Sequence, residues 1–235
     1  MRGCLFTVVL GVAVLAGVTV YVVPHVAEGA IKVAMTAAGF RADETDVRVH
    51  ADPPYQLLGL KAGTVTIRAT GVSLGTLTAS SMDLTLTDVD LRARTARKVS
   101  GVLLDAVASA QEGPVAIPRI DLSGDSGAID ATAFVDGTTI ERLVAQRVAI
   151  AAGVEPTAVR LREPNVLTIV MSGLSVSGDL VVGDDGAIRL SIGSPFGVQA
   201  TLLEDGATPL KLSAIQVRGD RVVLEGALDA TVLFG

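Results

Sequence analysis

The one dense group of cations in this sequence lies within seven residues and consists of Arg92, Arg94, Arg97 and Lys98. We expect them where a predicted strand ends and a predicted helix begins. Cations at a helix N-terminus oppose the helix dipole, so local stability does not require them. A lipid head-group phosphate is a suitable partner for such a group. The alternative is a solvated face whose cations pair with Asp88 and Asp90.

Side chains typical of catalytic or metal sites are few. The two histidines, His25 and His50, fit an interfacial role and a structural role. Two acidic pairs, at 184–185 and 204–205, each precede a glycine as in hairpin turns, and they lack the ladder of oxygen ligands of a calcium loop. The segment 95–98 has a nucleophile-x-x-Lys outline without a matching second motif. We therefore predict no enzyme, no catalytic residue, no metal site and no cofactor.

The composition excludes several classes of binding protein. Aromatic residues make up 3% of the chain and Trp is absent, which leaves little for stacking on sugars or bases. The 19 basic and 25 acidic residues give a net charge of −6, so nucleic acid is not an expected partner. The single Cys excludes an intramolecular disulfide. Hydrophobic residues make up 49% of the chain, so apolar surface is the feature most available for binding.

The N-terminus carries an apolar run that predicts a membrane segment. Nineteen residues, Leu5 to Val23, have no charge, and as a helix they span about 28 Å, close to a hydrocarbon core of roughly 30 Å. Arg2 precedes the run, so the rest of the chain should be exported. We expect a signal anchor over 1–25, an extracytoplasmic domain over 26–235, and a single-pass protein of the plasma membrane. The alternative is a protein secreted after signal cleavage near Ala27.

Period-two patterns predict a mainly antiparallel β domain. Apolar and polar residues alternate over 46–50, over 63–72 and over 82–91, where the pattern slips by one residue near Asp88, as at a bulge. Beyond Thr157 the chain has only strand patterns, and the turn signals Asp185-Gly186, Asp205-Gly206 and Gly219-Asp220 separate them as hairpins do.

Three amphipathic helices are expected beside these strands. The first covers 26–38, with Ala30, Val33, Ala34, Ala37 and Ala38 on one stripe. The second covers 97–110, and the third opens with a capping box at Thr138-x-x-Glu141 and ends at Gly153. We predict a long curved sheet around these helices, with an apolar cavity for acyl chains or, alternatively, an ordinary filled core. The predicted lipid contacts are Val99, Leu103, Val107, Ile140, Leu143, Val144 and Val148.

Three segments resemble one known family. They are the Leu-Leu-Gly segment and strand of 54–67, the run Leu84 to Val89, and Glu163-Pro164-Asn165 before a strand. With the N-terminal apolar run, they resemble the LmeA family of actinobacterial cell-envelope proteins over most of residues 26–235. The resemblance implies phospholipid binding, a tubular lipid-binding fold and support of lipoglycan elongation outside the plasma membrane. It brings no catalytic residue, and it identifies no individual binding residue.

Together these features predict a membrane-anchored, extracytoplasmic phospholipid-binding protein with an apolar acyl-chain cavity. It would support the assembly of lipid or lipoglycan in the cell envelope. The alternative is a non-catalytic scaffold module of the envelope with a filled core and a protein partner. A continuous apolar cavity favours lipid, whereas a packed core with an exposed edge strand favours the scaffold.

Overall fold

The computed structural model describes residues 23–37, 39–110, 113–193, 197, 199–203 and 210–228. Its helices are α2 (Val23–Ala37), the 3-10 helix η2 (Pro54–Gly59) and α3 (Gly137–Ala152). The larger sheet contains β1 (Phe40–Arg41), β2 (Glu44–His50), β3 (Lys61–Leu74), β4 (Leu77–Asp90), β5 (Thr95–Ala110), β6 (Gly113–Gly124), β7 (Ile129–Asp136), β13 (Leu210–Arg218) and β14 (Arg221–Leu228). The smaller sheet contains β8 (Ala158–Arg162), β9 (Val166–Met171), β10 (Leu174–Val182), β11 (Ile188–Ile192) and β12 (Gln199–Leu203).

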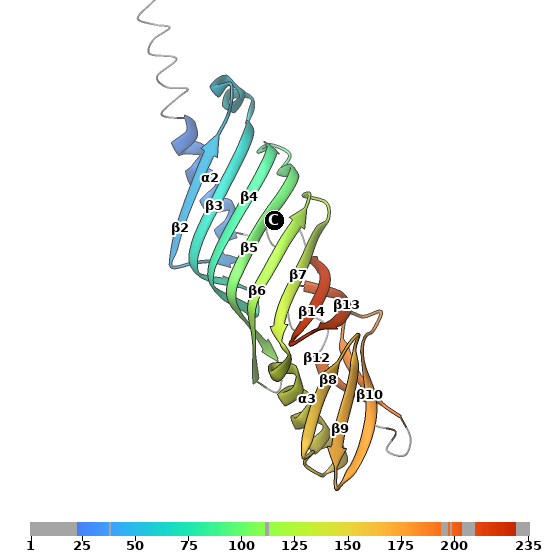
Figure 1. Cartoon of the computed structure of the whole chain (residues 1–235). Helices are drawn as coiled ribbons and strands as arrows, with labels where there is room; N and C mark the ends of the chain where they lie inside the picture. The colour runs from blue at the N-terminus through green and yellow to red at the C-terminus, as the bar shows by residue number, and fades with distance from the viewer. Residues whose placement is uncertain are drawn as a thin grey trace, which may run out of the picture.

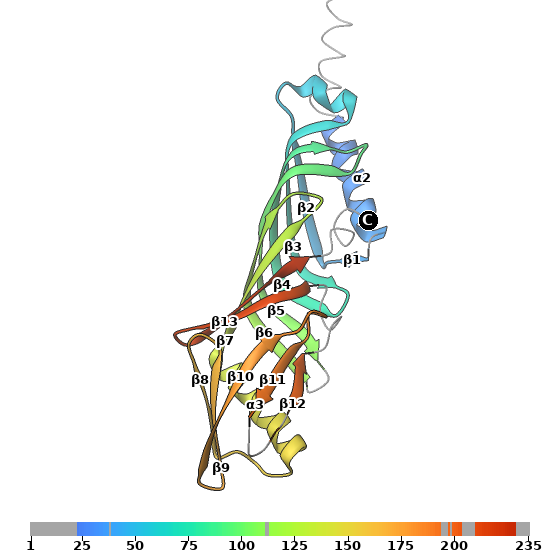
Figure 2. The same cartoon turned by 90° about the vertical axis from the view of Figure 1, so that its right-hand side faces the viewer.

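Both sheets are antiparallel, as the alternating patterns predict. The larger sheet has the order β1-β3-β4-β5-β6-β7-β14-β13, and β2 also pairs with β3. The smaller sheet runs β12-β11-β10-β9-β8. Figures 1 and 2 show one elongated molecule in which the larger sheet curves and α2 lies along its concave face. One continuous cluster of buried apolar side chains extends through both sheets. The prediction of a mainly antiparallel β domain with few helices is confirmed.

The slip predicted near Asp88 is present in β4. Leu86 and Val89 are both buried although they are three residues apart, and Asp88 between them is exposed. Asp88 has a φ of 51°, in the left-handed region. One residue in this conformation reverses the alternation and bends the strand. The apolar face of β4 therefore stays on the concave side up to its end.

The helix predicted over 97–110 is wrong, because this segment is the strand β5. It pairs with β4 on one side and β6 on the other. Its alternation slips twice, at the exposed pair Arg97-Lys98 and at the exposed pair Leu104-Asp105, where Asp105 has a φ of 49°. Two slips give the buried side chains steps of three and four residues, which imitate the spacing of a helix. Two neighbouring strands supply the backbone partners that decide between the two conformations.

The helix predicted after Thr138 is confirmed as α3. Ile140, Leu143, Val144 and Val148 are buried, and Gly153 ends the helix in a left-handed conformation. The predicted capping box is wrong. The N-cap residue is Asp136, and Oε1 of Glu141 instead accepts a hydrogen bond from the backbone N–H of Leu161 at 3.0 Å. This bond ties α3 to β8.

The N-terminal helix and two of the predicted turns are also confirmed. The chain is helical from Val23, three residues before the predicted start. The signals at 185–186 and 219–220 lie in the β10–β11 and β13–β14 hairpins. The third signal, at 205–206, and nearly all of the predicted anchor lie outside the described residues. Within the part of the chain that the structure describes, no helix has the length and apolarity to cross a bilayer.

Candidate functional site

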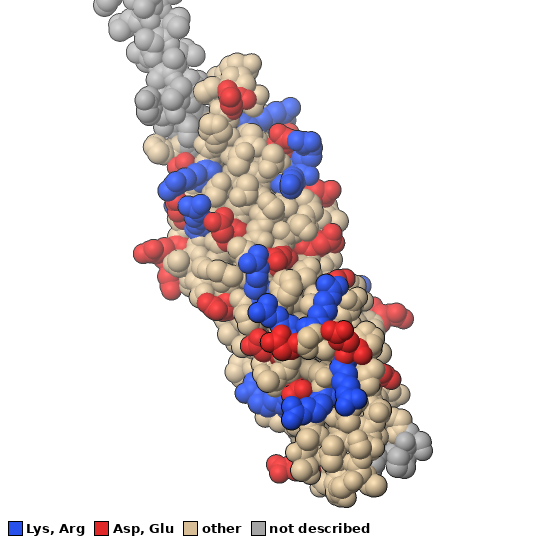
Figure 3. Space-filling model, in the orientation of Figure 1, with Lys and Arg blue, Asp and Glu red and all other residues tan. Residues whose placement is uncertain are grey.

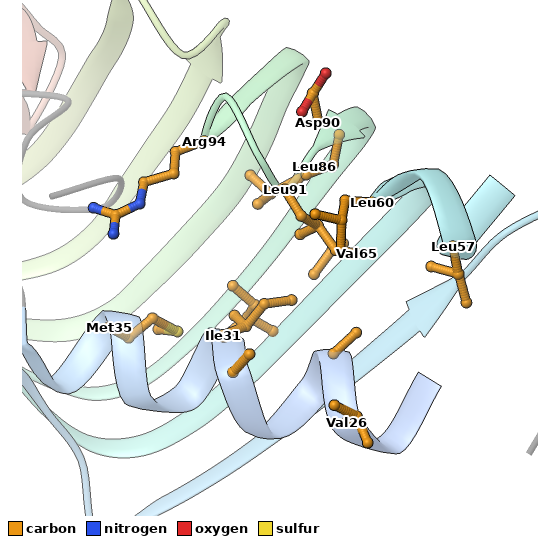
Figure 4. A pocket seen from close by; sticks show the side chains of 14 residues that line it. Val26, Ile31, Met35, Leu57, Leu60, Val65, Leu86, Asp90, Leu91 and Arg94 are labelled. Carbon is orange, nitrogen blue, oxygen red and sulfur yellow. The ribbon is translucent and has the colours of Figure 1, made fainter. Parts of the chain in front are cut away.

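A cavity of about 370 Å³ lies between α2 and the face of the larger sheet formed by β3 and β4. Figure 4 shows α2 along one side, with Val65, Leu86, Leu60 and Leu91 pointing towards it from the other. The η2 segment and the β4–β5 hairpin lie around it. The lining residues are Val26, Ala27, Ala30, Ile31, Met35, Leu57, Leu60, Val65, Ile67, Leu86, Val89, Asp90, Leu91 and Arg94.

The wall that α2 contributes to the cavity mixes small side chains, Ala27 and Ala30, with larger ones such as Ile31 and Met35. Ala27 and Ala30 of α2 line the cavity together with Val65 and Leu86 of the sheet, and the two alanines contribute only methyl groups to its wall. Packed protein interiors contain few voids larger than a water molecule. A volume of about 370 Å³ falls within the range of small-molecule sites. Its aliphatic walls suit an alkyl chain, because they offer no hydrogen bond that a polar ligand would need.

The charged lining residues, Asp90 and Arg94, belong to the hairpin between β4 and β5. Oδ1 of Asp90 accepts hydrogen bonds from the backbone N–H groups of Arg92 at 3.0 Å and Ala93 at 2.8 Å, which shapes the turn. Arg94 follows in a left-handed conformation with a φ of 55°. Figure 4 shows its side chain extended from the hairpin towards α2, with the guanidinium group opposite Met35. The apolar cavity thus has one cation at its rim.

The predicted cluster of four cations divides in the structure. Arg94 alone of the four lines the cavity. Arg97 lies on β5 and forms an ion pair with Asp88, as the alternative of a solvated face predicted. Arg92 and Lys98 are exposed. Because the group sits in a β-hairpin and β5 is a strand, the argument from a helix dipole does not apply.

The seven predicted lipid contacts lie elsewhere. Val99 and Leu103 are buried in β5, Val107 is half-buried there, and the four residues of α3 are buried. None of the seven lines the cavity beneath α2. Their contact with lipid therefore stays a prediction that the cavity does not support.

Sequence reasoning missed α2 as a wall of the cavity. The predicted stripe placed Val33 inward, whereas Val33 is exposed and Met35 is buried. The inward set is Ala27, Ile31 and Met35, which are spaced by four residues, the spacing of one helix face. That spacing is the signal in the sequence that identifies the correct face.

Two of the residues considered for catalytic or metal sites, His25 and Asp185, have structural partners. His50 is exposed on β2, and Nδ1 of His25 lies 3.0 Å from Oε2 of Glu28. Asp185 accepts a hydrogen bond from the backbone N–H of Ala187 and pairs with Arg189, as expected of a turn. Among the described residues, no three His, Cys, Asp or Glu side chains gather as metal ligands.

Comparison with known families gives one match that spans most of the chain. A family model described as LmeA-like phospholipid-binding matches residues 18–227. This range includes α2, η2 and every strand that lines the cavity. Neither the curated proteins nor the solved structures give a significant match.

Proposed function

Since the chain belongs to the LmeA-like phospholipid-binding family, we propose that it holds a phospholipid with one acyl chain in the cavity beneath α2. The observation that carries this proposal is the aliphatic lining of that cavity, in which Asp90 and Arg94 are the charged residues. An apolar cavity of about 370 Å³ favours lipid over the alternative of a scaffold module with a packed core.

Binding of the acyl chain needs no polar contact inside the cavity. Burial of each CH₂ group contributes about 0.8 kcal/mol, so several methylenes suffice for a stable complex. The twelve remaining lining residues are Val, Leu, Ile, Ala and Met. Such walls select for an extended alkyl chain and discriminate little among chains of similar length. The head group and any second chain stay outside the cavity.

Arg94 is the residue that we assign to the head group. A guanidinium group binds phosphate oxygens through paired hydrogen bonds, and Arg94 stands at the rim where a phosphate attached to the buried chain would lie. This proposal assigns one residue to the head group, whereas the sequence predicted a group of four cations. Arg97 does not line the cavity.

The cellular role that fits these features is non-catalytic. The protein would hold lipid at the outer face of the plasma membrane and so support the assembly of envelope lipid or lipoglycan. The uncharged run from Leu5 to Val23 after Arg2 supports an anchor with the domain outside the cytoplasm. The resemblance to envelope proteins of the same family supports the role in assembly.

Full-length protein extracted from membranes is expected to carry one phospholipid per chain. Native mass spectrometry would show the intact chain with the added mass of one lipid, and fragmentation of the released ligand would show its phosphate. Extracted protein with no lipid, or with variable numbers of lipids as from a detergent micelle, would contradict the proposal.

Arg94→Gln and Arg97→Gln form a matched pair for the head-group assignment. Loss of a charge-assisted hydrogen bond costs about 1.5–3 kcal/mol, so Arg94→Gln should lower lipid affinity by roughly 10- to 100-fold at low salt. Arg97→Gln should leave the affinity unchanged. If both substitutions changed the lipid affinity equally, Arg94 would not be the head-group residue.

A further inference from the structure

The end of the molecule that carries η2 exposes large apolar side chains to solvent. Tyr55 and Leu58 of η2 and the next residue, Leu60, are all exposed. Leu57, between them, is buried and lines the cavity together with Leu60. One short segment thus has a face in solvent and a face in the cavity. Leu60 belongs to both faces, because it is exposed and also lines the cavity.

The η2 segment is held in place by backbone contacts. The N–H of Leu60 donates to the carbonyl oxygen of Leu57 at 3.0 Å, and the N–H of Leu91 donates to the carbonyl oxygen of Leu60 at 2.8 Å. The second bond fixes η2 against the β4–β5 hairpin, which carries Arg94. The exposed side chains are therefore displayed by an ordered support at the mouth of the cavity.

Cations stand beside this apolar surface. Lys61 follows Leu60 and pairs in register with Asp90, and Arg92 projects from the neighbouring hairpin; both cations are exposed. Figure 3 shows Lys and Arg side chains near this end of the molecule. Asp52 is exposed there as well, so the surface is mixed rather than strongly basic. Tyr and Leu with nearby Lys and Arg are typical of surfaces at the water–lipid boundary.

The path of the chain indicates what this surface contacts. Figure 1 shows that α2 begins beside η2, and Val26 of its first turns lines the same cavity as Leu57. In the sequence, α2 directly follows the uncharged run from Leu5 to Val23. If that run enters a bilayer as predicted, the η2 end faces the same bilayer at short range.

We propose that the η2 end is a membrane-docking surface, on which Tyr55, Leu58 and Leu60 insert at the head-group level of a phospholipid bilayer. An acyl chain then passes between the bilayer and the cavity without crossing water. The docking stands independently of any bound lipid, whereas this path of entry rests on the proposed function.

A second apolar surface at the opposite end makes the proposal testable. Ile150 and Val154 near the end of α3, and Leu174 at the start of β10, are also exposed. Figures 1 and 2 show the β9–β10 hairpin at the end of the molecule remote from η2. Leu58 is 60% exposed and Leu174 is 59% exposed, so the two leucines form a matched pair of reporter positions.

The experiment uses the full-length chain in vesicles of phosphatidylcholine and phosphatidylglycerol. Cys4, the single cysteine, is replaced by Cys4→Ser, and a fluorophore is attached after Leu58→Cys or Leu174→Cys. Part of the phosphatidylcholine carries bromine on its acyl chains, which quenches a fluorophore only at short range. We expect strong quenching at position 58 and none at position 174. Quenching at 174 alone, or at neither position, would overturn the proposal.

Two further variants separate docking from lipid binding. Adding Ala27→Phe, which fills the cavity, should leave the quenching at position 58 unchanged, because docking does not need the cavity. Loss of quenching there would show that the signal came from bound lipid and would overturn docking.

Leu58→Asp should slow lipid uptake from vesicles several-fold, yet leave binding of a dispersed short-chain phosphatidylglycerol unchanged. Unchanged uptake from vesicles would overturn the path of entry, and thermal melting would establish that the variant is folded.

Discussion

Ala27→Phe is expected to weaken phospholipid binding by roughly 100-fold while the domain stays folded. Ala27 is half-buried on the face of α2 that lines the cavity, so a phenyl ring at this position occupies the space of an acyl chain. Exclusion of about four CH₂ groups, at about 0.8 kcal/mol each, removes about 3 kcal/mol of binding free energy. Filling an apolar cavity commonly maintains or raises the stability of the protein.

Ala37→Phe is the matched control for this substitution. Ala37 lies on the same helix, is exposed and does not line the cavity. Titration of each variant with a phospholipid that carries a fluorescent acyl chain gives the two affinities. Wild-type affinity in Ala27→Phe, or an equal loss in both variants, would show that the acyl chain binds elsewhere.

Leu103→Arg is expected to unfold the domain. Leu103 is 3% exposed in β5, between β4 and β6, and no carboxylate is paired with it across the strands: its partners in register are Met82 and Ile120. An unpaired charge in such a position costs about 3–5 kcal/mol. That is a large part of the total stability of a typical domain.

Leu104→Arg provides the comparison one residue away. Leu104 is 39% exposed on the other face of β5, so an arginine there should change the free energy of unfolding little. Urea unfolding of both variants measures the difference. A Leu103→Arg variant that stays folded and loses lipid binding would instead support the predicted lipid contact at β5.

The strands with regular alternation were predictable because their pattern depends only on neighbouring residues. In β3, Val65, Ile67 and Ala69 are buried, as the period of two requires. Even the slip at Asp88 was visible, since a single reversal leaves a regular pattern on both sides. β5 was not predictable in this way. Its two slips lie seven residues apart, and local spacing alone does not distinguish such a strand from an amphipathic helix.

The candidate site was less predictable than the fold. Arg94 was identified because a cluster of charges is visible in the sequence. Its separation from Arg97 depends on the β4–β5 hairpin, which directs one side chain to the cavity and leaves the other beside Asp88. The cavity itself lies between side chains of α2 and side chains of β3 and β4, which are distant from α2 in the sequence. Packing between distant segments appears in no local pattern.

Cross-linking of the acyl chain to the protein tests the central claim most directly. The full-length protein is mixed with vesicles that contain phosphatidylglycerol with a photoactivatable diazirine in one acyl chain, and the labelled peptides are identified after irradiation. The diagnostic residues are Met35 and Ile67, because both line the cavity and both are buried, out of reach of lipid at the surface. We predict label at these two positions and its loss in Ala27→Phe. Label confined to α3, to β5 or to the exposed residues of η2 would contradict the account.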